Sequence, residues 1–434
     1  AWERLSNIAI FSGGKTPPTS RLEYWGGNVL WVTSKDMKSK YITSSQLRLS
    51  TLGAEQMRLY QPDTLLLVTR SGILRHTLPV SILKEHATIN QDLKAIVLHM
   101  PQLSEYVYVC LKGMETQLLL KYTKSGTTVE SINFDEFQKV LLPIAPLQEV
   151  SRIVMAIYKA EHIVSSIEDD KVELLKYVEK AKAKILDLAI RGQLVPQNLN
   201  DEPASVLLEH IRTEKEKLIK QGKIKRDKKE SFIFKGEDNS YYEKMPDGKL
   251  RGLDDELPFD LPEGWEWCNL SMVGTTNIGL TYRPSDVDPD GVIVLRSCNI
   301  VNDQIDLSDL VRVNTTIREN QYAQKNDILI CARNGSKALV GKCALISDLG
   351  EPALFGAFMA IYRTECYEYI VHFLRSNYFR SVFDDSNSTA INQLTQDMLK
   401  RAIVPLPPLA EQYRIAETIK VVMTELSLIE KGLN

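Results

Sequence analysis

The chain has 434 residues, of which 44% are apolar and 25% charged, and its formal net charge is −3. This length predicts two or three domains with their own cores, and the composition is that of a globular protein. No apolar run approaches the ~18 residues that a membrane-spanning helix requires, and no secretory signal is evident, so no such helix is expected. The charge excludes a uniformly basic nucleic-acid binder, and any such binding must come from local patches.

The cysteines are scattered and lack the close pairs of a zinc site or a disulfide framework. We therefore expect reduced thiols in a cytoplasmic protein. Ala1 in place of Met indicates a trimmed start. The six cysteines are Cys110, Cys268, Cys298, Cys331, Cys343 and Cys366.

Residues 1–146 carry short apolar runs, such as 29–32, 64–68 and 94–98, separated by glycine and proline pairs. This pattern predicts a first mixed α+β domain. From residue 147 the apolar period changes from two to about three and a half, as in the a/d positions of a coiled coil. The first half of this seam consists of Ile153, Ile157, Ala160, Val164 and Ile167, and the second of Leu174, Val178, Ala181, Ile185 and Leu188.

A helix over 147–192 would be roughly 65 Å long, and Gly192 and Pro196 are expected to end it. Its seam either pairs with another helix or packs on its own domain. Residues 193–262 form a basic connector, with a short helix predicted after Pro203. Within it, Arg212–Glu230 holds nine Lys/Arg against four Asp/Glu, which fits either a solvated surface segment or a contact with phosphates or an acidic partner.

Residues 263–408 repeat the style of 1–146, and 409–434 repeat the helical seam with Ile415, Ile419, Val422, Leu426 and Ile429. Residues near 146 match residues near 408 at a constant offset of 262. The match extends upstream, where residues 127–129 correspond to residues 389–391. The starts correspond as well, since Trp2-Glu3-Arg4-Leu5 is similar to Trp267-Cys268-Asn269-Leu270. Pro143, Pro146, Leu147, Glu149, Arg152 and Ile153 match Pro405, Pro408, Leu409, Glu411, Arg414 and Ile415. The chain is therefore predicted to contain a duplicated module, each copy a domain followed by a helix.

Recognisable catalytic and metal-binding motifs are missing from the sequence. Ser12–Thr16 resembles a phosphate loop, but Ala9 stands where its first glycine is required and a proline pair follows. The six histidines lack paired metal-ligand spacing, and the carboxylates form no recognisable nuclease cluster. We expect no catalytic residue and no metal site.

Two segments carry a family resemblance that covers essentially the whole chain. Residues 184–197, KILDLAIRGQLVPQ, continuing to Asn200-Asp201-Glu202-Pro203-Ala204, resemble the central conserved region of type I restriction–modification specificity (S) subunits. The string PLPPLAEQ at 405–412 is similar to the boundary that ends each target recognition domain in that family. The first copy departs from it, with Ala145-Pro146-Leu147-Gln148 in place of Pro407-Pro408-Leu409-Ala410.

The resemblance implies an α+β fold with two pseudo-twofold-related target recognition domains, separated by a long antiparallel two-helix coiled coil. It further implies a non-catalytic subunit in which each domain recognises one half of a bipartite double-stranded DNA target. The helices would set the spacing and dock two methyltransferase (M) subunits, and motor–nuclease (R) subunits would join to restrict. This chain would hold no cofactor, since S-adenosylmethionine, ATP and Mg would belong to the partner subunits.

Candidate DNA-binding residues are the polar and basic side chains at loop positions, because such side chains hydrogen-bond phosphates and base edges. Arg70 and Arg333 occupy equivalent places after a strand, and each is either a DNA contact or a structural arginine that binds carbonyls or a carboxylate. The candidates are Lys15, Thr16, Thr33, Ser34, Lys35, Arg70 and Ser71 in the first domain, and Thr281, Tyr282, Arg283, Arg296, Ser297, Arg333, Asn334, Ser336 and Lys337 in the second.

Two other functions compete with a DNA-recognition subunit. One is a fused restriction–methylation enzyme whose catalytic part lies outside this chain. The other is an interaction scaffold with two adaptor domains and no DNA, which the near-neutral charge allows.

Overall fold

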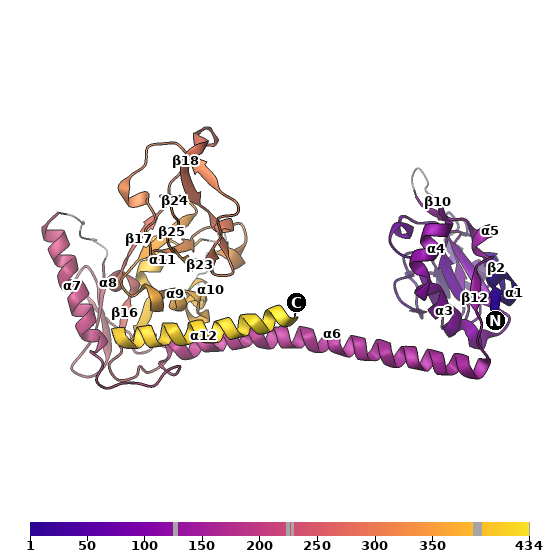
Figure 1. Ribbon diagram of the computed structural model, residues 1–434, viewed down its shortest axis with the longest axis horizontal. Helices are drawn as coiled ribbons and strands as arrows, with labels where there is room; N and C mark the ends of the chain where they lie inside the picture. The colour runs from indigo at the N-terminus through magenta and orange to yellow at the C-terminus, as the bar shows by residue number, and fades with distance from the viewer. Residues whose placement is uncertain (125–128, 223–225, 227–229, 385–392, 434) are drawn as a thin grey trace. The chain divides into compact units, whose positions relative to one another are not determined.

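A computed structural model describes residues 1–124, 129–222, 226, 230–384 and 393–433 of the chain. It divides into two compact units, residues 1–169 and 170–434, each of which is described by itself. The long helix α6 (Leu147–Ile190) belongs to both, since the division falls within it (Figure 1).

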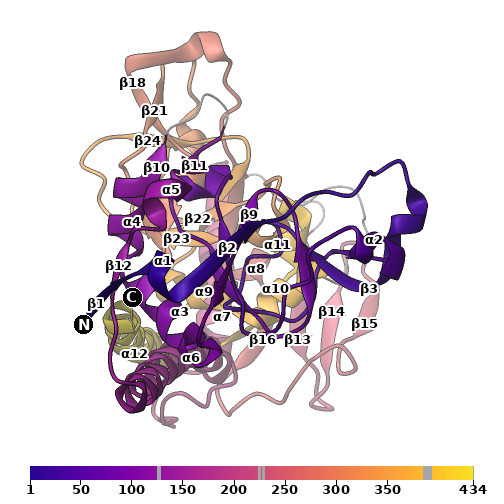
Figure 2. The ribbon, with the colours of Figure 1, turned by 90° about the vertical axis from the view of Figure 1, so that its right-hand side faces the viewer.

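The first unit is built on two sheets. Strand β6 lies in the middle of the larger one, and its four apolar residues are all buried, as expected for a strand covered on both faces. The larger sheet has the order β2 (Ala9–Gly13), β9 (Leu93–Leu98), β6 (Leu65–Val68), β7 (Val80–Leu83) and β4 (Tyr41–Ile42). The smaller has the order β5 (Leu47–Leu49), β3 (Trp25–Val32) and β8 (Ala87–Ile89). Figure 2 shows β2 beside β9, with which it pairs in antiparallel register.

Short helices and the chain ends of this domain complete its core. The first strand, β1 (Trp2–Arg4), pairs with the last, β12 (Leu141–Pro143), so the domain closes where it begins. Buried Val107 and Phe137 pack from α3 and α5 against apolar residues of the larger sheet. The helices are α1 (Leu5–Ile8), α2 (Thr51–Glu55), α3 (Ser104–Gly113), α4 (Glu115–Tyr122) and α5 (Phe134–Phe137), and β10 (Thr123–Lys124) pairs antiparallel with β11 (Ser131–Ile132).

The second unit contains a domain of the same design. Its larger sheet has the order β17 (Thr275–Ile278), β25 (Met359–Arg363), β22 (Ile328–Cys331) and β23 (Cys343–Leu345). The smaller has the order β21 (Val311–Val313), β18 (Val287–Leu295) and β24 (Ala353–Phe355). The remaining elements are α8 (Leu270–Val273), α9 (Tyr367–Arg375), α10 (Asn377–Asp384), α11 (Gln396–Arg401), the closing pair β16 (Glu266–Asn269) and β26 (Ile403–Leu406), and the hairpin of β19 (Ile300–Val301) and β20 (Gln304–Ile305).

The duplication is confirmed at the level of single contacts. Trp2 pairs with Pro143 in the first domain, as Trp267 pairs with Pro405 in the second. A tyrosine hydroxyl donates to each of these proline carbonyls over 2.7 Å, from Tyr106 to Pro143 and from Tyr369 to Pro405. The repeat predicted upstream, at 127–128 and 389–391, lies outside the described residues. The expected α+β class, with two similar domains and a long helix between them, is confirmed.

Within the second unit, the end of α6 and helix α12 (Leu409–Leu433) lie side by side in antiparallel directions (Figure 1). Lys182 binds Glu430 near the end of α12 over 2.7 Å, whereas Gln197, which follows α6, binds Glu411 at its start over 2.8 Å. The alternative for the seam also holds in part, because buried Ile415 and Ile419 belong to the same core cluster as side chains of α9 in their own domain.

The antiparallel pairing is confined to one part of α6, because α12 is the shorter helix. Residues 161–170 are all exposed, including the seam positions Val164 and Ile167, and Leu174 is 48% exposed. At the start of α6 the seam residue Ile153 is half-buried against the core of the first domain, and towards the end of the helix the seam is buried from Val178, which is 6% exposed. Helix α12 has 25 residues against 44 in α6, so it lies alongside only the last turns of its longer counterpart.

The connector contains the predicted helix, α7 (Ala204–Lys220), which starts directly after Pro203. It also contains a three-stranded antiparallel sheet that the sequence analysis missed, formed by β13 (Phe232–Lys235), β14 (Tyr241–Lys244) and β15 (Leu250–Gly252). In the predicted basic segment, residues 223–225 and 227–229 lie outside the described residues. Of its other cations, Arg226 pairs with Glu216 at the surface, whereas Lys215 pairs with Glu230 and donates to the Ser271 carbonyl in a partly buried position.

All six cysteines are free thiols, in agreement with the sequence analysis. None of the helices that the structure describes combines the length and the apolar character needed to cross a bilayer.

Candidate nucleic-acid interface

In the first domain, three predicted loops meet at one edge of the sheets. Strands β2 and β6 each pair antiparallel with β9 and so run parallel to each other, which places their carboxyl ends at the same edge. The backbone N–H of Lys15 donates to the carbonyl of Ile89 over 3.1 Å, and the Trp31 indole donates to the carbonyl of Lys15 over 3.3 Å. The loops after β2, β3 and β6 are therefore neighbours in one surface.

The second domain repeats this arrangement with its own residues. The N–H of Leu280 donates to the carbonyl of Phe355 over 2.7 Å, as Lys15 does to Ile89. The Asn334 carboxamide donates to the Ser297 hydroxyl over 3.4 Å, which joins the loop after β22 to the loop after β18. Two candidate residues predicted separately are thus in contact.

A glycine makes the close approach of these loops possible in each domain. A Cβ on Gly14 would lie 2.0 Å from the carbonyl oxygen of Ile89, and one on Gly279 would lie 2.1 Å from that of Phe355. Any side chain at either position would push the loop away from the neighbouring strand end. The two glycines therefore define the edge on which the candidate residues stand.

In the first domain, Lys15, Lys35 and Arg70 are exposed. No carboxylate of the described chain forms an ion pair with any of the three. Other candidates hold the loops together: the Thr16 hydroxyl donates to Gln91 over 2.5 Å, and that of Thr33 donates to Asp36 over 2.8 Å. Ser34 is half-buried, and the Ser71 hydroxyl accepts the N–H of Ile73.

In the second domain the structure separates two kinds of arginine. The Arg296 guanidinium donates to the Asp309 carboxylate over 3.0 Å, and the Arg296 backbone N–H donates to the Asn299 side-chain oxygen. This candidate therefore has a structural role. Arg283 and Arg333 are exposed, and neither forms an ion pair with a carboxylate that the structure describes. The Arg333 guanidinium lies 5.6 Å from the centre of the exposed Phe358 ring.

The remaining candidates of this domain also lie in the three loops. Thr281 is exposed and Tyr282 is half-buried beside it. The Asn334 side-chain oxygen accepts the N–H of Ser336 over 3.0 Å, which shapes the turn that carries the exposed Ser336 and Lys337.

The sequence analysis missed three side chains at this edge, Gln91, Phe358 and Gln393. Each domain has a fourth loop at this edge: Gln91 lies in the loop that precedes β9, and Phe358 lies in the loop that precedes β25. Gln393 lies just before α11. These segments carry no lysine or arginine, so a search for basic loop residues passes over them. The backbone bridge of Arg333 to Gln393 is visible only in the structure.

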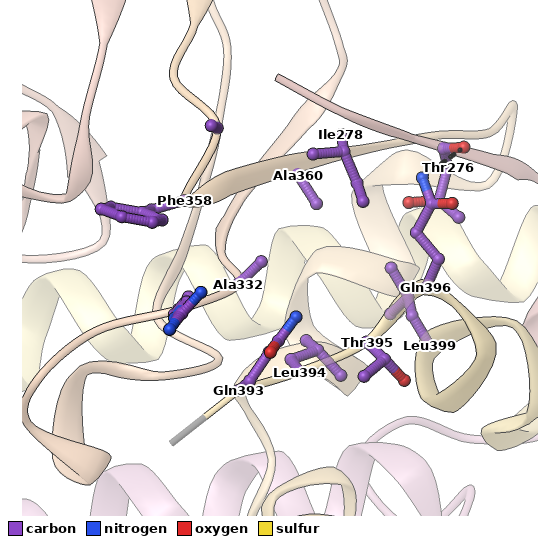
Figure 3. Close-up of a pocket in the computed structure, with 12 residues that line it drawn as sticks. Thr276, Ile278, Ala332, Phe358, Ala360, Gln393, Leu394, Thr395, Gln396 and Leu399 are labelled. Atoms are coloured by element: carbon purple, nitrogen blue, oxygen red, sulfur yellow. Dashed lines mark hydrogen bonds between the residues drawn. The ribbon is translucent and has the colours of Figure 1, made fainter. Parts of the chain in front are cut away.

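Phe358 and Gln393 line a pocket of about 280 Å³ in the second domain. Figure 3 shows Phe358, Ala332 and Gln393 towards one end of it, and Thr276, Gln396 and Leu399 towards the other. The Gln396 carboxamide donates to the carbonyl of Thr276 over 3.4 Å, whereas the buried Thr276 hydroxyl oxygen has no hydrogen-bond partner among the described residues. The pocket thus combines apolar side chains such as Ile278, Ala360 and Leu399 with polar ones.

Two thiols lie in the strand ends and loops of this edge, Cys331 at the end of β22 and the exposed Cys298 in the loop after β18. Burial raises the pKa of the Cys331 thiol, so the one thiol at the end of β22 stays protonated and is a poor nucleophile. Among the described residues, no group of three or more His, Cys, Asp or Glu side chains is placed to hold a metal ion. What the edge offers is guanidinium, carboxamide and hydroxyl groups on loops fixed by backbone hydrogen bonds.

Comparison with known proteins identifies this architecture. The model of the family "Type I restriction modification DNA specificity domain" matches residues 1–176 and 262–434, which are the two copies of the module. The chain belongs to this family. The predicted relationship to type I specificity subunits is thereby confirmed, and the matched residues include 405–412, whereas 184–197 lie between the two matched parts. The relatives below are described as specificity subunits of type I restriction enzymes.

The specificity subunit of the type I restriction enzyme EcoAI of Escherichia coli is 33% identical over 245 residues, which cover 55% of this chain and 38% of that protein. The EcoR124I/EcoR124II specificity subunit of Escherichia coli is 30% identical over 169 residues, which cover 38% of this chain and 42% of that protein. The matched part of the chain thus spans well under half the length of either relative. The HsdS subunit of Thermoanaerobacter tengcongensis shares the fold, with a TM-score of 0.58 at 15% identity, over 100% of this chain and 91% of that one.

Proposed function

We propose that the chain is the non-catalytic DNA sequence-recognition subunit of a type I restriction–modification complex in the cytoplasm. Each domain recognises one half of a bipartite double-stranded target through the loop edge described above. Helices α6 and α12 set the distance between the half-sites and dock two methyltransferase subunits, which motor–nuclease subunits join. S-adenosylmethionine, ATP and Mg belong to those partners.

One observation carries this proposal: the same loop edge occurs twice in one chain. Each copy presents an exposed arginine after its central buried strand, Arg70 and Arg333, with no ion pair to a described carboxylate. A guanidinium left free of carboxylates is available for phosphates or for the O6 and N7 atoms of guanine. A duplicated recognition surface suits a target with two separate parts.

DNA binding by the full chain, assembled with its methyltransferase subunits, tests the proposal. Binding should weaken linearly with the logarithm of salt concentration, because phosphate contacts release counterions. Arg333→Ala should relax base choice in one half-site by about 1–3 kcal/mol if the arginine contacts guanine. It should weaken binding to all sequences equally if it contacts a phosphate. If Arg333→Ala changed neither base choice nor overall affinity, Arg333 would not belong to the interface.

The spacing role has its own test. Inserting one heptad between Ile167 and Leu174 lengthens α6 by about 10 Å at 1.5 Å per residue. Methylation mapping should then show a changed gap between the half-sites, with the bases of each half-site unchanged. An unchanged gap would show that α6 is not the spacer.

The same preparations separate the competing functions. Labelled methyl donor and DNA, incubated with the chain alone, should give no labelled DNA, whereas an enzyme would label it. A scaffold without a DNA role would show no salt-dependent binding.

A further inference from the structure

The two domains provide an internal comparison at the arginine that follows the central strand. Arg70 forms an isolated antiparallel bridge with Ser131, and Arg333 forms the same bridge with Gln393. Directly beside them, the N–H of Ile132 donates to Thr69 over 2.9 Å, and the N–H of Leu394 donates to Ala332 over 2.7 Å. The backbone frame around the two arginines is therefore the same.

The fourth loop belongs to this frame. The N–H of Thr69 donates to the carbonyl of Asp92 over 2.8 Å, and the N–H of Ala332 donates to that of Phe358 over 2.9 Å. Asp92 and Phe358 thus occupy equivalent positions next to the shared arginine. Two positions differ in chemistry within one frame: aspartate against phenylalanine, and serine against glutamine.

The shared and the differing side chains suit different tasks. Phosphate contacts are the same for every sequence and position a protein on DNA, whereas base-edge contacts carry sequence information. Two copies that recognise different half-sites should therefore share their phosphate contacts and differ in the side chains that contact bases. Building on the proposed function, we infer that Gln393 and Phe358 select the base pair that the second domain reads beside Arg333, with Ser131 and Asp92 at the equivalent positions of the first.

The chemistry of the second domain points to an A·T pair. The exposed Gln393 carboxamide has one acceptor and two donors, which match N6 and N7 of adenine in the major groove. Phe358 is 60% exposed and presents an apolar face suited to the thymine methyl group. The ring also lies beside the Arg333 guanidinium, which fixes the arginine next to the position being read.

The side chains of Gln393 and Phe358 are exposed, so they contribute little to the core and are accessible to a ligand. Gln393 has an exposed side chain at the mouth of the pocket, and its backbone bridge to Arg333 holds the segment in place (Figure 3). In contrast, Gln396 in the same pocket donates to the Thr276 carbonyl and is half-buried. Changes at 393 and 358 should therefore leave the fold intact.

The test is a selection of bound duplexes from a pool randomised over both half-sites, with the full chain in its methyltransferase complex. Gln393→Glu removes the donors and leaves acceptors that suit cytosine N4, at nearly the same size. We expect adenine at one position of one half-site to give way to cytosine, by about 5- to 150-fold, which is 1–3 kcal/mol at 1.4 kcal/mol per tenfold. The half-site of the first domain is the internal control and should be unchanged.

A second variant tests the methyl contact. Deoxyuridine in place of thymidine at the selected pair should weaken DNA binding by the unaltered chain. DNA binding by the Phe358→Ala variant should not change. Melting of both variants, compared with the unaltered chain, shows whether the fold is kept. Altered preference in the first half-site, or unchanged preference in the second, overturns the inference while the proposed function stands. Absence of any bipartite preference in the unaltered chain overturns both.

Discussion

The indole N–H of Trp265 donates a hydrogen bond to Glu411 Oε2 over 3.0 Å, and both side chains are buried. Trp265 precedes β16, and Glu411 stands in the first turn of α12. Gln197, in the segment that follows α6, donates to the other carboxylate oxygen over 2.8 Å. One carboxylate therefore joins three segments that are remote in the sequence, two of which contain the motifs typical of the family.

Replacing Glu411 should have opposite effects depending on the substitute. Glu411→Ala leaves the buried indole N–H without an acceptor and should cost about 1–3 kcal/mol of unfolding free energy. Glu411→Gln keeps an acceptor and removes a buried charge, so it should be neutral or stabilising at neutral pH. Urea unfolding followed by tryptophan fluorescence measures both, and equal losses would contradict this assignment.

The same residue gives a pH dependence. Burial raises the pKa of the Glu411 carboxyl above its ordinary value of 4.5, although the hydrogen bonds from Trp265 and Gln197 act in the opposite direction. The folded state thus holds this proton more tightly than the unfolded state. The stabilising contribution of the protonated form is complete below 4.5 and is lost as pH rises through the folded-state pKa. The advantage of Glu411→Gln should therefore shrink on acidification, and an advantage that grows would contradict the sign.

Tyr158 anchors the start of α6 to the first domain. Its hydroxyl accepts from Lys40 Nζ over 2.8 Å and donates to Glu105, and the same ammonium lies 4.0 Å from the ring centre. Tyr158→Phe should cost about 0.5–1.5 kcal/mol per lost hydrogen bond, and Tyr158→Ala more, because the ring is lost as well. Tyr177→Phe, on an exposed turn of α6, is the matched control and should change stability by less than about 0.5 kcal/mol.

Gly14→Ala tests the loop edge. The added Cβ would meet the Ile89 carbonyl oxygen at 2.0 Å, so the loop or the strand end must move. Overpacking of this kind costs about 1–3 kcal/mol, and DNA binding at the corresponding half-site should fall with it. Gly72→Ala, where a Cβ meets nothing within 4 Å, should change stability by no more than about 0.5 kcal/mol. Equal effects of the two variants would remove the steric argument.

Two ion pairs of the second domain differ in burial and should differ in effect. Arg363 binds Asp327 through two hydrogen bonds of 2.6 and 2.7 Å, and the Asp327 side chain is 1% exposed. Arg363→Met leaves this carboxylate buried and unpaired, which should cost about 3–5 kcal/mol. The control Arg312→Met breaks an equally short pair with Glu351, but both partners are partly exposed, so the loss should stay under about 1 kcal/mol.

The duplication could be predicted because the two copies share identical residues at a constant spacing. Pro143 and Pro405 hold the same place in the closing strand pair, and an offset of 262 residues is visible without any structure. The sheet of β13–β15 was missed, although Phe232, Phe234 and Tyr242 carry the aromatic signal of strands. The surrounding lysines and glutamates outweighed that signal and favoured a connector.

The candidate site was predictable at the level of loops and not of roles. Arg296 and Arg333 are alike in the sequence, but Asp309 lies beside the first, whereas the second has an aromatic ring as its neighbour. Partners this far apart in the chain follow from tertiary structure, which loop composition does not encode. The same reason hid Gln393, whose position beside Arg333 depends on a bridge across 60 residues.

The twelve consecutive exposed residues of α6, 159–170, have a consequence for its motions. Because these side chains bury little surface, the turns depend mainly on intrahelical hydrogen bonds, and a helix of this kind is only marginally stable in water. Amide protons here should exchange with solvent faster than those of 178–190, where the same helix is packed into the core of the second unit. A bound partner that covered the stretch would slow that exchange, so hydrogen–deuterium exchange offers a direct footprint of assembly.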